Sequence, residues 1–330
     1  MNRYGERAAK YLAELANISE PGAGVTRMPF TEEHRQANDM VSRWMRDAGM
    51  TVHVDDAGTL IGRLPGKTGK RCLLMGSHQD SVRHGGAYDG IMGVVLPILL
   101  VDRLRETGIR LDFDLECLAF ADEEGVRFPT ALLGPRALAG TVEAGVLDYC
   151  DGEGVSLGQA MREFGLEPDF IGKLKRDPQR IIAFVETHIE QGPVLEDANE
   201  ALGIVSAISG IERHQLSLIG EAAHAGTMPM HLRHDALAAA ARVISAAEEL
   251  ACSNRKLVAT VGRVDVEPNV VNAIPGKVDL TVELRSPDDA CREMAGEELA
   301  NFAAELAERR GLGCDMERTY AQAARPCDAA

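Results

Sequence analysis

The sequence predicts an α/β protein with two domains: a mostly parallel sheet flanked by helices, and a smaller βαββαβ domain inserted after it. Short apolar runs at residues 72–75, 111–120 and 181–185 alternate with helical segments, which favours parallel strands covered by helices. After about residue 208 the predicted order changes to strand, helix, strand, strand, helix, strand. A chain of 330 residues exceeds a typical single domain and agrees with this division.

The first domain is predicted to span residues 1–208. Residues 1–20 have the pattern of a charged amphipathic helix without a signal-peptide core. Residues 31–49 predict a helix, because acids occupy its first turn, an apolar stripe follows and a glycine ends it. Residues 51–54 and 59–63 predict a hairpin, and residues 91–100 predict a buried helix that opens directly after a glycine-rich loop.

The second domain is predicted to span residues 209–320. Its strands are expected at residues 213–219, 256–266, 277–285 and 314–320, and its helices at 233–250 and 287–310. Ser286 is expected to cap the second helix, with Pro287 in its first position. This order is the ferredoxin-like arrangement, a four-stranded sheet with two helices on one face.

The composition excludes several classes of partner. The chain has 51 acidic and 35 basic residues and a formal charge of −16, so no basic stripe is available for nucleic acid or an anionic membrane surface. No apolar run approaches the roughly 20 residues of a membrane span. Seven cysteines without a C-x-x-C spacing indicate reduced thiols, so we expect a cytoplasmic protein.

Polar side chains that bind metals follow each of the three apolar strands. The carboxyl ends of parallel strands lie at one edge of a sheet, so these side chains should converge there. Mixed nitrogen and oxygen donors suit zinc, with manganese possible. Each residue alone would more often be a solvated or loop-capping group, but six at three strand ends argue for a metal site. The six are His78, Asp80, Asp89, Glu123, Glu124 and His188.

The spacing suggests separate roles for these residues. Asp89, central in a glycine-rich loop, is the best candidate to bridge two ions. Asp80 lies two residues after His78 and cannot easily share its metal, but could accept a hydrogen bond from the imidazole. Glu123 and Glu124 would point in opposite directions on strand-like backbone, so one should bind metal and the other act as general base.

Several motifs together resemble one family, the hydantoinase/carbamoylase amidases of the aminoacylase–carboxypeptidase clan of dinuclear metallohydrolases. The motifs are GSHQDSV, GGAYDGIMGV, FADEEGVRFP, THIEQGPVLE, HAGTMPM, NVVNAIPG and VELRS. The resemblance implies a metallo-aminopeptidase-like catalytic domain, an inserted lid and dimerisation domain, two divalent metal ions and a homodimer formed through the lid. Enzymes of this family hydrolyse ureido compounds: N-carbamoyl-L-amino acids, N-carbamoyl-β-alanine, allantoate and ureidoglycolate.

The resemblance also implies roles for the metal-site residues. By motif, His78 and His188 would bind one metal, and Asp89 would bridge to the second. Glu124 would bind the second metal, and Glu123 would be the general base.

Residues of the smaller domain would contact the substrate. His224 resembles the residue that polarises the scissile carbonyl and stabilises the oxyanion, and Asn272 and Arg285 resemble the residues that hold the substrate carboxylate. Gln191 is a further candidate for the ureido group. Arg285 in a surface ion pair and Asn272 as a turn cap are the alternatives.

Two departures from the family pattern affect these expectations. The family's catalytic domain is completed after the lid by a segment whose Ser-Gly-Ala-Gly-His-Asp motif carries the last ligand of the second metal. Residues 321–330 correspond only to a stub of that segment, so we expect weak binding of the second ion and apolar sheet surface left exposed. Ile211 and Glu212 stand near a substrate-binding Gln of the allantoate enzymes, which favours an N-carbamoyl amino acid as substrate.

The leading hypothesis is therefore a metal-dependent amidohydrolase that cleaves the C–N bond of N-carbamoyl amino acids. Allantoate amidohydrolase is the first alternative, and a dipeptidase or aminoacylase is the second. A third alternative is a catalytically impaired protein that binds a small molecule or metal without turnover.

Overall fold

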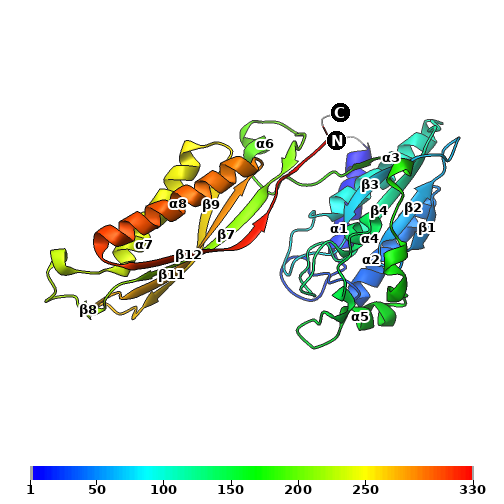
Figure 1. Ribbon diagram of the computed structural model, residues 1–330. Helices are drawn as coiled ribbons and strands as arrows, with labels where there is room; N and C mark the ends of the chain where they lie inside the picture. The colour runs from blue at the N-terminus through cyan, green and yellow to red at the C-terminus, as the bar shows by residue number, and fades with distance from the viewer. Residues whose placement is uncertain (1–2, 329–330) are drawn as a thin grey trace. The chain divides into compact units, whose positions relative to one another are not determined.

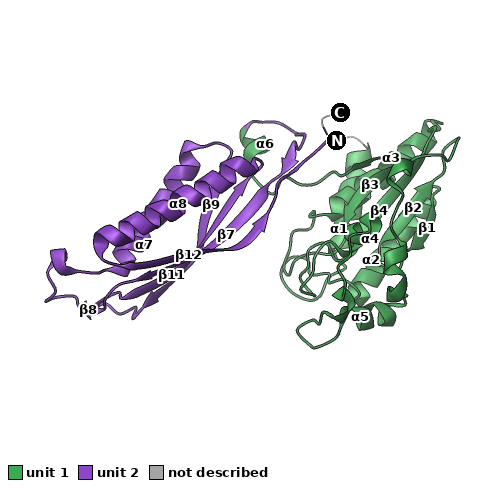
Figure 2. Ribbon diagram, in the orientation of Figure 1, with its two compact units in different colours: residues 1–197 green, residues 198–330 purple. Residues whose placement is uncertain are grey.

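The computed structural model describes residues 3–328 and consists of two compact units (Figures 1 and 2). Unit 1 comprises Met1–Asp197 and unit 2 comprises Ala198–Ala330. The predicted class is confirmed: unit 1 holds a mixed sheet flanked by helices, and unit 2 holds a separate antiparallel sheet. Within residues 3–328 no helix combines the length and apolar character that a bilayer crossing needs.

The sheet of unit 1 has the order β1-β2-β4-β3-β5. Strands β4, β3 and β5 are mutually parallel, and the hairpin β1–β2 extends the sheet antiparallel on the β4 side. The strands are β1 Thr51–Val54, β2 Leu60–Leu64, β3 Cys72–His78, β4 Asp114–Phe120 and β5 Ile181–Val185. The predicted parallel strands and hairpin are thus present, and the carboxyl ends of β3, β4 and β5 lie at one edge of the sheet.

Three helices and one face of the sheet enclose the main core of unit 1. The helices are α1 Arg3–Ala16, α2 Glu32–Asp47 and α3 Ile91–Glu106. Leu12, Val41, Ile98 and Leu115 from these elements belong to one buried cluster. Each such side chain contributes about 1.5–3 kcal/mol by its removal from water. Helix α2 begins where predicted, because the hydroxyl of Thr31 accepts the backbone N–H of His34.

Short helices between β4 and β5 form a second cluster that the sequence did not predict. They are α4 Leu133–Ala139, η1 Val146–Asp148, α5 Leu157–Phe164, η2 Pro168–Lys173 and η3 Pro178–Arg180, and α6 Val194–Asp197 follows β5. Phe30, Phe128 and Met161 are buried in this cluster. The side chains of Ile182, Phe184 and Val185 on β5 are exposed within the described residues.

Unit 2 has the predicted ferredoxin-like topology. Its antiparallel sheet has the order β12-β7-β11-β9, and helices α7 and α8 share one buried core with it. The elements are β7 Gly210–Ile219, α7 Ala236–Ser253, β9 Val258–Glu267, β11 Lys277–Ser286, α8 Asp289–Arg310 and β12 Gly313–Gln322. Small additions are η4 Met230–Leu232 and two short pairs, β8 Ala223–His224 with β10 Ala273–Ile274 and β6 Ala207–Ile208 with β13 Arg325–Pro326.

The start of α8 differs from the prediction. Asp288, and not Ser286, caps the helix, because its carboxylate accepts the backbone N–H of Cys291. Ser286 ends β11, and its hydroxyl accepts the N–H of Asp288, so Pro287 lies outside the helix. Both residue types are good caps, but a carboxylate also interacts favourably with the helix dipole.

Candidate metal centre

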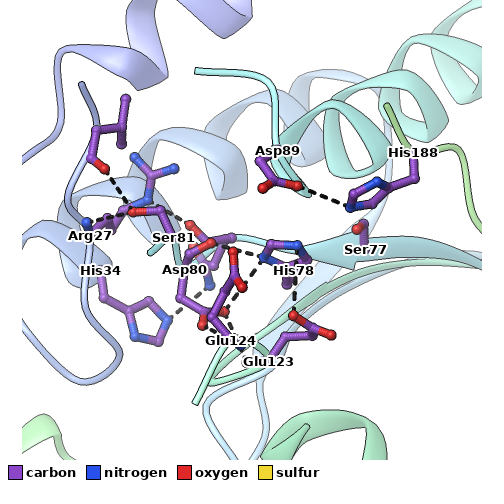
Figure 3. Close-up of polar contacts among 12 residues, drawn as sticks. Arg27, His34, Ser77, His78, Asp80, Ser81, Asp89, Glu123, Glu124 and His188 are labelled. Atoms are coloured by element: carbon purple, nitrogen blue, oxygen red, sulfur yellow. Dashed lines mark hydrogen bonds and ion pairs between the residues drawn. The ribbon is translucent and has the colours of Figure 1, made fainter. Parts of the chain in front are cut away.

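The three strand ends bring the predicted metal ligands together (Figure 3). One ligand atom from each of His78, Asp89 and His188 lies within 4.8 Å of the others. A second group of the same kind contains His78, Glu123 and Glu124. His78 belongs to both groups, so it stands at the centre of the cluster.

Backbone contacts fix the orientation of His78. Its Nδ1 donates to the carbonyl oxygen of Asp80 at 2.9 Å, which leaves the lone pair of Nε2 free to bind a cation. Gly90 lies against this nitrogen: a Cβ at residue 90 would be 2.3 Å from Nε2, and its φ is +63°. Only glycine fits there, since both the imidazole and the backbone conformation exclude a side chain.

Asp89 and His188 form the part of the site that most requires a cation. His188 Nδ1 donates to the carbonyl oxygen of Ile189 at 2.9 Å, so the neutral ring presents the lone pair of Nε2 to Asp89 Oδ1 at 3.2 Å. Two lone pairs at this distance repel each other unless a proton or a metal ion lies between them. Asp89 Oδ1 is buried and has no hydrogen-bond partner within residues 3–328. The donor set therefore fits a divalent ion.

The carboxylate of Asp80 has a different role from the one expected. Its two oxygens accept the backbone N–H groups of Glu123 at 3.2 Å and Glu124 at 3.1 Å. The imidazole of His78 instead donates to the Asp80 carbonyl oxygen, while the carboxylate stays 3.9 Å from Nδ1. Asp80 thus links the β3 end of the site to the loop that follows β4.

Glu123 and Glu124 do not point in opposite directions. Asp122 has a φ of +53°, so the chain turns after β4 and the strand-like backbone assumed from the sequence is absent. Both carboxylates reach His78, and Glu123 Oε2 lies 3.9 Å from His78 Nε2. Glu124 is therefore grouped with His78 and not with Asp89, the partner expected for a second ion.

The cluster carries an excess of acid. Burial raises the pKa values of Asp80, Glu123 and Glu124. The pKa of Asp122 rises to about 8, because the residue is buried and faces Asp80. Burial opposes the charge of His78, but the surrounding carboxylates outweigh it and raise its pKa. Asp80, Asp89 and Glu123 each lie within 3.9 Å of a histidine nitrogen, and within the described residues neither they nor Glu124 form an ion pair with Lys or Arg.

Glu123 also faces a groove of about 370 Å³. Apolar side chains from β4 and β5, among them Phe120, Ile181 and Phe184, line it. His78 and Glu123 contribute polar groups to the same groove. A small molecule with an apolar part could therefore lie beside the two polar residues.

The remaining predicted site residues are Gln191 and three residues of unit 2. Gln191 Nε2 donates to Asp89 Oδ2 at 2.9 Å, a contact with the metal site that the sequence did not suggest. His224 and Asn272 are neighbours, since the N–H of Ala225 donates to the Asn272 carbonyl oxygen at 3.0 Å.

Arg285 lies near the carboxyl end of β11, whereas β10 lies next to the amino end of this strand at Lys277. The strand from Lys277 to Arg285 spans roughly 27 Å, at about 3.4 Å per residue. Its Nε donates to Glu283 at 2.7 Å, which is the surface ion pair considered as an alternative. Within unit 2 the three predicted substrate residues therefore lie at two ends of the sheet.

The sequence did not predict a role at the site for His34 and Gln79, whose side chains contact each other beside it. The sequence did contain a signal for His34: it and Asn38 are polar residues four apart on the buried face of α2, the spacing of neighbours on a helix.

The fold and the ligand cluster are those of an α/β metallohydrolase with a second, antiparallel domain. A model of peptidase family M20/M25/M40 matches residues 74–324. An N-carbamoyl-L-amino acid amidohydrolase of Geobacillus stearothermophilus is 41% identical over 316 residues, which are 95% of this chain and 77% of that protein. The chain belongs to the M20/M25/M40 family and, within it, to the hydantoinase/carbamoylase amidases, as the motifs predicted.

Two further comparisons support this assignment. A hydantoinase/carbamoylase amidase from Burkholderia multivorans has a solved structure with a TM-score of 0.91 and 32% identity, covering 98% of this chain and 79% of that one. An allantoate deiminase of Glycine max is 35% identical, covering 98% of this chain and 72% of that protein. The protein is thus a hydrolase of a family that acts on C–N bonds other than peptide bonds.

Proposed function

We propose that the protein hydrolyses N-carbamoyl-L-amino acids in a metal-dependent reaction. The arrangement of His78, Asp89 and His188, with a buried and unpaired carboxylate oxygen, carries the metal-dependent part. Three relatives with 37–41% identity are N-carbamoyl-L-amino acid amidohydrolases, which supports the substrate class. Allantoate is the second candidate, because an allantoate deiminase of Arabidopsis thaliana matches 96% of the chain at 35% identity.

His78, Asp89 and His188 would hold one ion, and Glu124, which is grouped with His78, would contribute to a second one. Zinc or manganese fits this donor set. A bound divalent ion lowers the pKa of water and polarises a carbonyl oxygen. Glu123, whose pKa is raised by burial, would take the proton from the attacking water and deliver it to the leaving nitrogen.

The overall reaction consumes water and breaks the C–N bonds of the ureido group. Water attacks the carbamoyl carbon and breaks one C–N bond, and the resulting carbamate then loses carbon dioxide, so that one water yields the amino acid, ammonia and carbon dioxide. In unit 2, His224 would stabilise the oxyanion, and Asn272 with Arg285 would hold the substrate carboxylate. Gln191, which donates to Asp89, would position that carboxylate and contact the ureido group.

A homodimer formed through unit 2 is part of this proposal. His224 and Asn272 are separated from Arg285 by most of the length of β11. Two copies of the chain could supply these residues to one site, which a single unit 2 does not bring together. A cytoplasmic location is likewise proposed, supported by seven free cysteines.

Metal analysis combined with a substrate panel tests the proposed function. The purified chain would be reconstituted with zinc or manganese, and ammonia release measured with N-carbamoyl-L-amino acids, their D-enantiomers and allantoate. Dipeptides and N-acyl amino acids, followed by amino-group release, test for dipeptidase and aminoacylase activity. We expect bound metal and the fastest turnover with an N-carbamoyl-L-amino acid. Metal binding without turnover of any substrate would favour a binding protein, and absence of both would refute the proposal.

A further inference from the structure

Gln79 lies between two residues of the metal centre, but its own side chain points away from it. The residue stands between His78 and Asp80 and is 1% exposed. Its amide group contacts His34 Nε2 at 2.9 Å and Asn38 Oδ1 at 2.8 Å, and both partners belong to α2. Figure 3 shows His34 and Arg27 on the side of Asp80 that faces away from Asp89 and His188.

The contact with His34 has a defined direction. His34 Nδ1 accepts the backbone N–H of Phe30 at 2.9 Å, so a neutral ring carries its proton on Nε2 and must donate there. The end of the Gln79 amide that faces both His34 and Asn38 is therefore its carbonyl oxygen, and the Asn38 amide turns with it, so that its NH2 group donates to the same oxygen. The ring is buried and stacks on Phe164 with centroids 4.7 Å apart, and burial lowers its pKa to about 3.

The backbone of Gln79 is held as firmly as its side chain. Its N–H donates to the carbonyl oxygen of Phe120 at 3.1 Å, at the end of β4 and just before the Glu123 loop. Its carbonyl oxygen accepts Nε of Arg27 at 2.7 Å. Arg27 is itself buried and donates to the carbonyl oxygens of Leu15 and Ile18 near the end of α1.

A shift of residue 79 would therefore move both neighbouring site residues. The acceptor of His78 Nδ1 is the carbonyl oxygen of Asp80, and the Asp80 carboxylate holds the N–H groups of Glu123 and Glu124. A buried hydrogen bond fixes the orientation of the side chains that form it, at a cost in desolvation. An apolar side chain of similar size would fill the space without fixing that orientation. The polar pair between Gln79 and His34 thus has a geometric role that apolar packing would not supply.

We propose, on the basis of the metal-dependent function described above, that Gln79 is a positioning residue for the metal centre. Its amide, held by His34 and Asn38 on α2, fixes the ring of His78 as a metal ligand. Through Asp80 it also fixes the backbone that carries the general base Glu123.

Replacement of Gln79 by methionine tests this role, because the volume is similar and both hydrogen bonds are lost. Wild type and Gln79→Met would be loaded with Co²⁺, whose visible absorption reports the geometry of its ligands. We expect a changed cobalt spectrum, a metal affinity lowered by about 10–100-fold and a kcat lowered by about tenfold, with KM within about twofold. A matched control is His214→Gln, which alters a buried histidine of β7 in unit 2. The control should lower the unfolding midpoint and leave the cobalt spectrum and kcat unchanged.

The outcomes separate this inference from the proposed function. A folded Gln79→Met variant with the wild-type spectrum and kcat overturns the positioning role. If that variant does not fold, Asn38→Leu removes one of the two amide contacts from a greater distance and should show a smaller change of the same kind. An unchanged spectrum and kcat for Asn38→Leu would equally overturn the role. Failure of the wild type to bind cobalt refutes the metal-dependent function itself.

Discussion

Each unit of the protein contains a buried cluster of charged residues, and the two clusters balance their charges differently. In unit 2, Glu212 Oε1 accepts Arg318 at 2.7 Å, Arg292 lies 3.9 Å from Oε2, and Arg292 also pairs with Asp289. Arg292 also lies 3.5 Å from Glu293, and His214 Nε2 lies 3.6 Å from Glu212 Oε2, so every acid of this cluster has an arginine partner. In unit 1, Asp80, Asp89 and Glu123 lie beside histidines, and within residues 3–328 none of the acids of the metal centre forms an ion pair with Lys or Arg.

The difference indicates what each cluster is for. The acids of the unit 2 cluster have arginine partners within the same unit, and the cluster joins α8 to the sheet, since Asp289 also accepts the N–H of Ala324 at 2.9 Å. The unit 1 cluster is short of positive charge, and burial raises the pKa values of its carboxyl groups. A divalent ion would supply the missing charge. An acidic cluster that lacks its own cations is therefore a better indicator of function than a buried ion-pair network.

The largest expected effect concerns the acid that would act as base. Glu123→Gln removes the proton acceptor and keeps the size of the side chain, so we expect kcat for an N-carbamoyl-L-amino acid to fall by about 10²–10⁴-fold. Metal content, measured by elemental analysis, should stay at the wild-type level. The control is Glu143→Gln, an acid paired with Arg136 away from the site, which should leave kcat unchanged. A Glu123→Gln variant that keeps more than about a tenth of the activity would contradict the assignment.

The corresponding change in unit 2 should affect stability and not chemistry. Arg292→Met leaves the buried carboxylate of Glu212 with a single arginine, and breaking a buried pair in this way costs about 3–5 kcal/mol. Denaturant unfolding measures the loss. Arg309→Met, which removes an exposed pair with Glu305 on α8, is the control and should cost less than about 0.5 kcal/mol. A similar small loss for both variants would show that the unit 2 cluster is not structural.

The strands and helices of both units were predictable from the sequence, because they depend on local patterns of apolar and polar residues. The apolar runs gave β3, β4 and β5, and parallel pairing then placed His78, Glu123 and His188 at one edge of the sheet. The ferredoxin-like order of unit 2 likewise followed from alternating strands and helices.

Features that depend on tertiary contacts were not predictable in the same way. The φ of Asp122 turns both glutamates toward His78, and although Asp adopts left-handed backbone more often than most residues, its type alone does not specify that turn. The cap of α8 was placed two residues early, because Ser286 and Asp288 are both suitable residues and only the end of β11 decides between them. Contacts such as that between Gln79 and His34 join segments 45 positions apart, beyond the reach of any local pattern.

Metal addition should stabilise one unit selectively. At a free zinc concentration of about 100 times Kd, binding to the folded state contributes about 2.7 kcal/mol. Hydrogen–deuterium exchange should therefore slow in β3 and in the loops that carry Asp89 and His188, while β7 and β11 of unit 2 remain unchanged. Chelation should reverse the effect, and His78→Ala should abolish it, because His78 belongs to both ligand groups. Equal protection of the two units would contradict a metal site confined to unit 1.

The smallest expected effect is a pH dependence that distinguishes His34 from the acids of the cluster. Burial, with Arg27 and Arg35 nearby, lowers the pKa of His34 to about 3, so the native ring stays neutral while an unfolded chain binds a proton below about pH 6.5. The unfolded state then gains protons as the pH falls, so this contribution to stability is complete above pH 6.5 and is lost toward pH 3. The loss should be about 1.4 kcal/mol per pH unit.

Urea unfolding of wild type and His34→Gln at pH 7, 6 and 5 measures this loss of stability. Comparison of slopes cancels the carboxyl groups that both proteins share, so the wild type should lose stability more steeply than the variant. Parallel slopes would mean that His34 takes up a proton in the folded protein and does not donate to Gln79 as a neutral ring.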